Sequence, residues 1–244
     1  MTYCVGILVK DGLAMLGDTR TNAGVDNVST YRKLRIFGND GQRVIAVASA
    51  GNLSTTQAAL ERARLGVTAP DNQTTETIES AGSIHRAAYL FGQALNVTRQ
   101  ELEGLKQEDV DFDATLLVGG GVGGEPSRLF LVYGAGNFIE CCPDTPYLQI
   151  GETKYGRPIL DRALTYETVL EEAVKIALIS FSSTMPSDLA VGLPIDLVTL
   201  RAGQCRAELI YRIEDDDAYY RDLNDRWSEA LRAAQASIPE PPYR

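Results

Sequence analysis

The stretch TYCVGILV, residues 2–9, decides the fold, because an apolar run begins directly behind the initiator methionine. Its β-branched, aromatic and small apolar residues predict a buried strand, and the turn KDG at 10–12 ends it. This strand leaves one polar residue, Thr2, at the edge of the core. Polar residues at the ends of other strands are therefore candidates for a site that they share with Thr2.

The remaining elements are predicted to alternate in blocks of strands and pairs of helices. Hairpins dominate the strand blocks, which favours antiparallel sheets, and each helical pair can cover one sheet. The sequence therefore predicts an α+β fold, a four-layer αββα sandwich. Strands are predicted within 3–9, 13–21, 31–37, 43–51, 113–121, 128–136, 138–142, 147–151 and 195–213, and helices within 53–66, 77–95, 156–165 and 167–185.

The segment after residue 213 is predicted to lie outside this sandwich. We expect a domain at 1–213, followed at 214–244 by a charged amphipathic helix from about 216 to 236 and a proline-rich tail. A stripe of larger side chains recurs along the helix at intervals of three and four. Such a stripe packs on its own domain or against a neighbouring subunit, and the sequence leaves both open. The stripe is formed by Tyr220, Leu223, Trp227, Leu231 and Ala234.

Charge and composition exclude several classes of partner. The formal net charge is −10 and the pI about 4.7, so a nucleic acid or an anionic membrane surface would be repelled. No signal peptide and no run of about 20 apolar residues is found. The four cysteines form no pattern typical of secreted disulfide frameworks, which predicts a cytoplasmic protein.

Because the chain has a single histidine, His85, the sequence argues against a histidine-dependent catalytic triad and against a histidine-rich metal site. It lies in a predicted helix, where a lone histidine is more often structural than a catalytic base. Zinc motifs are absent. The glycine-rich stretch 119–124 lacks the lysine of a phosphate-binding loop and is predicted to connect a hairpin. We therefore expect no metal and no cofactor.

A lysine and an aspartate near the predicted strand ends form a candidate pair. Lys33 lies within a β-pattern, and a buried lysine requires a carboxylate partner. Asp18, at the end of the second strand, is the natural candidate. A structural ion pair would explain these two residues alone. Thr2 at the second position, Asp-x-Arg-Thr at 18–21 and Ser-Ala-Gly at 49–51 together point instead to a site.

Three blocks carry a resemblance to a known family. They are TYCVGILV at 2–9, GDTRTNAGVDNVSTYRKLRIF at 17–37 and ASAGNLSTTQ at 48–57. They resemble the proteasome-type N-terminal nucleophile hydrolases, and most closely the bacterial Anbu family. The resemblance implies a threonine-type peptidase subunit of a homo-oligomeric ring or helical coil. It also implies peptides or unfolded proteins as substrates, and leaves open whether an unfoldase is a further partner.

The resemblance assigns a role to each residue of the candidate site. Thr2 is the nucleophile once Met1 has been removed, and its own α-amine is the base, with an unperturbed pKa near 8. Lys33, paired with Asp18, keeps that amine neutral by its charge. The backbone N–H of Gly51 binds the oxyanion. Thr21, Asn22 and Ser49 lie along the substrate.

Two departures from the family pattern affect the proton network. Glu152 stands where proteasome subunits have a serine after the strand that ends at 150, and Val191 replaces the serine that follows Asp188. Asp188 itself matches as a catalytic residue. Two alternatives remain at this stage. One is an assembly scaffold with little or no turnover, and the other is an amidohydrolase that acts on small amides.

Overall fold

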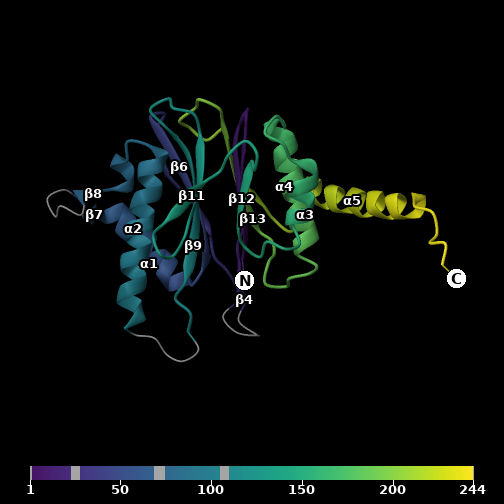
Figure 1. Ribbon diagram of the computed structural model, residues 1–244, viewed down its shortest axis with the longest axis horizontal. Helices are drawn as coiled ribbons and strands as arrows, with labels where there is room; N and C mark the ends of the chain where they lie inside the picture. The colour runs from purple at the N-terminus through teal and green to yellow at the C-terminus, as the bar shows by residue number, and fades with distance from the viewer. Residues whose placement is uncertain (1, 23–27, 69–74, 105–109, 244) are drawn as a thin grey trace.

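The structure, a computed structural model, describes residues 2–22, 28–68, 75–104 and 110–243. Within these residues, two five-stranded antiparallel sheets face each other (Figure 1). The first sheet has the order β12 (Tyr147–Gly151), β1 (Tyr3–Val9), β2 (Gly12–Asp18), β13 (Ile195–Arg201) and β14 (Leu209–Ile213). The second has the order β11 (Phe138–Glu140), β10 (Arg128–Val132), β9 (Ala114–Val122), β6 (Arg43–Gly51) and β5 (Leu34–Gly38).

Helices cover the outer face of each sheet. On one side lie α1 (Leu53–Leu65) and α2 (Ile84–Glu103). The short helix η1 (Ile78–Ser80) comes directly before α2. On the other side lie α3 (Arg157–Ala163) and α4 (Leu170–Thr184). Apolar side chains fill both sheet–helix interfaces and the space between the sheets. The predicted αββα sandwich is confirmed.

Strand register brings several strand ends to one rim of the sandwich. Tyr3 pairs with Gly151 and Cys4 with Gly17, so Thr2 lies beside the ends of β12 and β2. In the second sheet, Gly51 ends β6 and pairs with Ala114 of β9. Two further pairs of short strands are β3 (Arg20–Asn22) with β4 (Val28–Thr30), and β7 (Val67–Thr68) with β8 (Thr75–Glu76).

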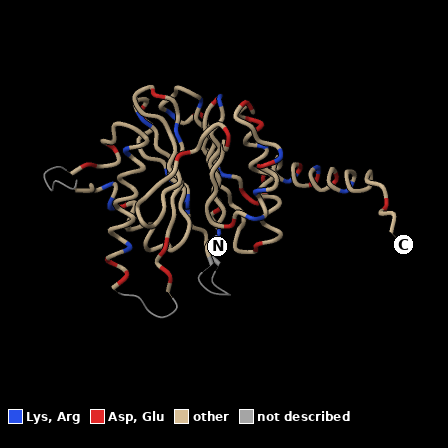
Figure 2. The backbone as a smooth tube through the Cα atoms, in the orientation of Figure 1, with Lys and Arg blue, Asp and Glu red and all other residues tan. Residues whose placement is uncertain are grey.

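The last helix, α5 (Ala218–Ser237), points away from the sandwich (Figure 1). Asp217 caps it by accepting a hydrogen bond from the N–H of Tyr220 at 2.8 Å. Its first turns bury Tyr220 and Leu223 against the body, and residues 228–237 are exposed. Both signs of charge follow its length (Figure 2). An exposed helical segment this short is marginal in water on its own, so α5 is suited to an external contact.

Several predicted boundaries were wrong. The strand predicted at 31–37 begins only at Leu34, so Lys33 precedes β5 rather than lying within a strand. The strand predicted at 13–21 ends at Asp18, and β3 is a separate short strand. Residues 119–121 continue β9, and the chain turns at Gly123 and Gly124, where φ is 64° and 80°. No helix in the described ranges is long and apolar enough to cross a membrane.

Candidate active site

A cavity of about 780 Å³ opens at the rim where these strand ends meet. It contains five of the residues that the sequence singles out, and they come from separate segments of the first 51 residues. The shared position of these residues follows from the strand register described above. The cavity is lined by Thr2, Thr21, Lys33, Ser49, Ala50, Gly51, Asn52, Leu53, Thr56, Asp111, Asp113 and Gly151.

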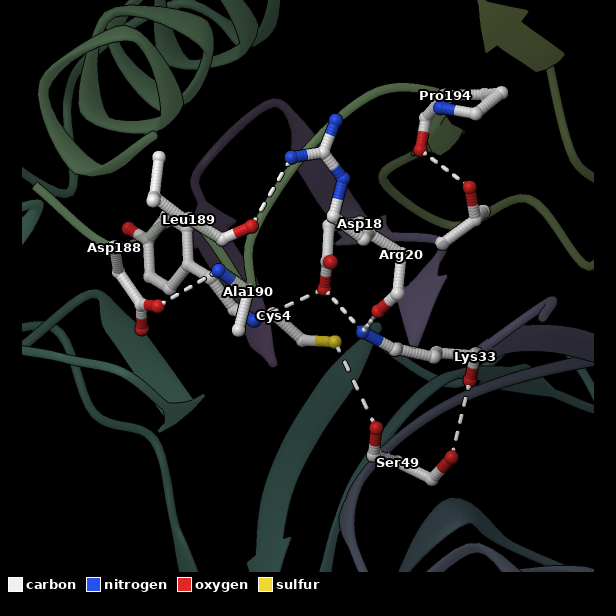
Figure 3. A network of polar contacts seen from close by, with 11 residues as sticks. Cys4, Asp18, Arg20, Lys33, Ser49, Asp188, Leu189, Ala190 and Pro194 are labelled. Carbon is white, nitrogen blue, oxygen red and sulfur yellow. Dashed lines mark hydrogen bonds and ion pairs between the residues drawn. The ribbon is translucent and has the colours of Figure 1, made fainter. Parts of the chain in front are cut away.

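Lys33 lines the cavity and forms a buried ion pair with Asp18. The ammonium of Lys33 lies 2.7 Å from Oδ1 of Asp18, and their side chains are only 6% and 0% exposed (Figure 3). The same ammonium donates to the carbonyl oxygen of Arg20 at 2.6 Å. An ammonium has three donors, so one is left for a group in the cavity.

Asp18 joins the cation to the first strand. Its Oδ1 accepts a second hydrogen bond, from the backbone N–H of Tyr3 at 3.0 Å. Burial raises the pKa of Asp18, whereas the Lys33 charge and the N–H groups of Tyr3 and Gly192 act in the opposite direction. A carboxylate in this setting depends on its cation, so removal of either partner would leave the other uncompensated.

Residues at the end of β12 hold the main chain of Thr2. Its carbonyl oxygen accepts a hydrogen bond from the N–H of Glu152 at 2.6 Å. Gly151 has a φ of 82°, and a Cβ there would lie 2.0 Å from that carbonyl oxygen. Only glycine permits this approach. The Glu152 side chain is itself buried, and its Oε1 accepts from the N–H of Lys154 at 2.9 Å.

Gly51 and Ser49 form the adjoining edge. Gly51 has a φ of 100°, and an added Cβ would lie 2.4 Å from the carbonyl oxygen of Asp113. Ser49 is buried, and its N–H donates to the carbonyl oxygen of Lys33 at 3.2 Å. The strand that carries the glycine therefore also fixes the backbone of the lysine.

Three predicted site residues are not among those that line the cavity: Asp18, which is paired with Lys33, and also Asp188 and Asn22. Asp188 belongs to the loop between α4 and β13, where its Oδ1 accepts from the N–H of Ala190 at 2.9 Å (Figure 3). Arg20 ties this loop to the site by donating to the carbonyl oxygen of Leu189 at 3.0 Å. Asn22 ends β3, one residue beyond Thr21, which does line the cavity.

Tyr3 is a component of this region that the sequence does not single out. Its hydroxyl is buried, lies 2.8 Å from Oγ of Ser180 and accepts from Nε2 of Gln149 at 2.7 Å. Its ring packs against Phe181. The residue that follows Thr2 is thus anchored both in the sheet and in α4. An apolar strand pattern gives no sign of such an anchor.

His85 lies away from the cavity. It is exposed on α2, with its ring edge-on to Phe130 and Phe138. Within the described residues no group of three or more metal-ligating side chains is found. Cys4, Cys141, Cys142 and Cys205 are all free thiols.

Comparison with known proteins identifies the family. No family model matches the chain. Anbu from Yersinia bercovieri, described as an ancestral β-subunit, is 42% identical with a TM-score of 0.90, covering 99% of this chain and 100% of that one. The chain belongs to the Anbu family. Anbu from Hyphomicrobium sp. strain MC1 is 41% identical, with a TM-score of 0.88, and covers 99% of this chain and 100% of its own.

Two other relatives place this Anbu protein among the proteasome-like proteins. An Anbu complex from Pseudomonas aeruginosa, solved as a helical assembly, is 38% identical, with a TM-score of 0.88 over 98% of both chains. Proteasome subunit beta 2 of Pyrobaculum neutrophilum is 26% identical over 205 residues, which are 84% of this chain and 91% of that protein. The chain is therefore a proteasome β-subunit-like protein with the N-terminal nucleophile hydrolase fold.

Proposed function

We propose that this Anbu protein is a threonine-type peptidase subunit whose nucleophile is Thr2 after removal of Met1. The observation that carries the proposal is the cavity that contains both Thr2 and the buried ammonium of Lys33. An ion pair between a lysine and an aspartate at a strand end can be purely structural. The presence of Thr2 in the same cavity favours a catalytic role, because the Lys33 charge can then act on the amine and hydroxyl of that threonine.

The first step is activation of the threonine hydroxyl. The free α-amine of Thr2 takes the proton from Oγ1, and the oxygen attacks the carbonyl carbon of the substrate. The Lys33 charge disfavours protonation of that amine and so keeps it available as a base. The third ammonium donor of Lys33 is suited to the hydroxyl oxygen, because the other two bond Asp18 and the carbonyl oxygen of Arg20.

The following steps use the edge of the cavity. The N–H of Gly51 stabilises the oxyanion, and the protonated amine gives its proton to the leaving nitrogen as the C–N bond breaks. Water then hydrolyses the ester at Thr2, with the same amine as base. Thr21, Asn22 and Ser49 are assigned to the substrate backbone, which β3 would receive as an added strand.

Asp188 and Glu152 affect proton transfer in this reaction. Asp188 and the hydrogen bonds of its loop stand next to the site, and we assign it to the proton network. Glu152, whose backbone N–H bonds the carbonyl oxygen of Thr2, has a buried carboxylate where proteasome subunits have a serine. A carboxylate favours the ammonium form, so we expect low or narrow activity at neutral pH. Glu152 and Val191 are also the residues that favour the alternative function, an assembly scaffold with little turnover.

Assembly completes the proposal. We assign this chain to a homo-oligomeric ring or coil, as in the helical assembly of the P. aeruginosa relative. The exposed part of α5 provides one contact with a neighbouring subunit. Peptides or unfolded proteins are the expected substrates. The four free thiols favour the cytoplasm.

Hydrolysis of a substrate panel by the intact protein tests the proposal. Internally quenched peptides and small amides would be compared for the wild-type chain, Thr2→Ala and Thr165→Ala, the last a control in an exposed turn. We expect cleavage of peptides by the wild type and the control, and loss of at least about 10³-fold in Thr2→Ala. Cleavage of small amides alone would favour the amidohydrolase, and no cleavage at all would favour the scaffold. Equal rates for Thr2→Ala and wild type would exclude the threonine mechanism.

A further inference from the structure

The side chain of Tyr3, the residue after the proposed nucleophile, ends at a junction of three elements. Its hydroxyl contacts Gln149 of β12 and Ser180 of α4, and it lies close to the backbone of Gly156, where α3 begins. A Cβ at Gly156 would lie 2.4 Å from the hydroxyl oxygen, so the glycine leaves the room that this group needs. The first sheet and the outer helical layer therefore meet at one polar group.

The hydrogen bonds at this junction run in one direction. The hydroxyl of Ser180 has a single proton, which it donates to the carbonyl oxygen of Ala177 at 2.6 Å. Tyr3 is therefore the donor in the contact of 2.8 Å between its hydroxyl and Oγ of Ser180. The tyrosine oxygen in turn accepts from Nε2 of Gln149 at 2.7 Å. Because Tyr3 and Ser180 are both fully buried, bulk water does not compete for these bonds.

The main chain of Tyr3 connects the same residue to the candidate active site. Its backbone N–H donates to Oδ1 of Asp18 at 3.0 Å, and that oxygen also accepts from the Lys33 ammonium at 2.7 Å. The Tyr3 side chain packs among the apolar residues that face α3 and α4, whereas Thr2, one residue earlier, lines the cavity. The peptide unit that joins the two residues is rigid. A displacement of Tyr3 therefore also displaces Thr2 relative to Lys33.

We propose that Tyr3 is a positioning residue, through which the α3–α4 layer holds Thr2 in place relative to the Lys33–Asp18 pair. The inference rests on the proposed function of Thr2 and adds two residues, Tyr3 and Ser180, that do not line the cavity. Tyr3 transfers no proton in this scheme, because burial raises the pKa of its phenol and keeps the hydroxyl protonated. Its effect on the reaction comes only from where it holds the neighbouring residue.

A second buried tyrosine of the same sheet provides a matched control. Tyr147 belongs to the same apolar cluster as Tyr3, and its hydroxyl donates to Oδ1 of Asp161 in α3. It pairs with Ile7, further along β1 and away from Thr2. Tyr147→Phe therefore also removes a hydroxyl that joins the first sheet to the helical layer, but it leaves the residues next to Thr2 untouched. A purely structural tyrosine would affect stability and leave the kcat of the folded protein unchanged.

Steady-state hydrolysis of an internally quenched peptide tests the positioning role. Full-length wild type, Tyr3→Phe, Ser180→Ala and Tyr147→Phe would be compared at a temperature where circular dichroism shows each of them folded. We expect kcat to fall about 10-fold in Tyr3→Phe and in Ser180→Ala with KM unchanged, because each loses one buried hydrogen bond. Tyr147→Phe should retain the kcat of wild type. The double variant Tyr3→Phe/Ser180→Ala should lose little more than Tyr3→Phe, since both substitutions remove the same bond.

Amide hydrogen exchange separates this role from the proposed chemistry. Exchange of the backbone N–H of residue 3, followed by NMR spectroscopy of isotope-labelled protein, depends neither on hydrolysis nor on removal of Met1. We expect exchange about 10-fold faster than in wild type for Tyr3→Phe and Ser180→Ala, and a wild-type rate for Tyr147→Phe.

The two readouts fail in different ways. If the wild type cleaves no peptide, the proposed function fails, and exchange alone then decides whether the Tyr3 hydroxyl holds this segment. Equal exchange at residue 3 in Tyr3→Phe and Tyr147→Phe would overturn the inference. So would a kcat for Tyr3→Phe equal to that of Tyr147→Phe in a protein that does cleave the peptide.

Discussion

Replacement of Lys33 by methionine separates the electrostatics of the buried pair from its packing. The variant keeps an apolar stem of similar length and removes only the charge. Asp18 then remains 0% exposed and loses the only cation with which it forms an ion pair among the described residues. Breaking a buried pair by removal of one partner costs about 3–5 kcal/mol. We therefore expect Lys33→Met to lower the free energy of unfolding by about this amount at pH 8.

The loss should depend on pH with a definite sign. Burial already raises the pKa of Asp18, and loss of Lys33 removes the largest opposing influence. The folded variant then holds a proton on Asp18 at pH values where the unfolded chain, with an aspartate pKa of about 3.9, has released it. Stability of the variant relative to wild type therefore falls as pH rises from the pKa of Asp18 in the folded wild type to its higher pKa in the folded variant. The deficit should be smaller at pH 5 than at pH 8.

Urea unfolding followed by circular dichroism at pH 5 and pH 8 measures this difference, at one fixed protein concentration because the chain is expected to assemble. Lys10→Met is the control, since its pair with Glu167 is exposed and should change the urea midpoint little. The double variant Lys33→Met/Asp18→Asn removes both charges of this pair and should recover part of the loss. Equal deficits at both pH values, or additive single losses in the double variant, would show that the two residues are not coupled as described.

Two further predictions concern the rest of the chain. Iodoacetamide should modify exposed Cys142 first and spare Cys4 and Cys141 until the protein unfolds. Burial raises the pKa of the Cys4 thiol and raises that of Cys141 to about 12. Peptide mass mapping would show the order of modification, and early modification of Cys4 would contradict its burial. Truncation after Ile213 should lower the oligomer mass measured by light scattering. Circular dichroism should still report a folded domain, because α5 buries only Tyr220 and Leu223 against its own body. An unchanged oligomer mass would show that α5 has no part in assembly.

Much of the architecture is predictable from the sequence because local and tertiary signals agree. The strand 3–9 is apolar, bounded by a turn, and buried as expected. The αββα order follows from the alternation of strand and helix blocks. The pairing of Lys33 with Asp18 is predictable from chemistry alone, since a buried lysine needs a carboxylate. The structure agrees, although Lys33 lies before β5 and not within it.

Other parts of the site depend on geometry that a single sequence does not carry. The approach of Glu152 to the carbonyl of Thr2 follows from the register of β12 against β1, and that register is set by side-chain packing over the whole sheet. The anchoring of Tyr3 by Ser180 joins residues 177 positions apart.

Covalent trapping of Thr2 tests the central proposal most directly. A peptide epoxyketone needs both the hydroxyl and a free α-amine on one residue to form its cyclic adduct, so it reports the nucleophile and the terminus together. Intact mass analysis and peptide mapping of the labelled protein would locate the adduct. We expect a single adduct on Thr2 of chains that lack Met1, absent in Thr2→Ala and slowed in Lys33→Met. A protein that lacks Met1 but forms no adduct, or forms it on another residue such as Cys142, would contradict the threonine mechanism.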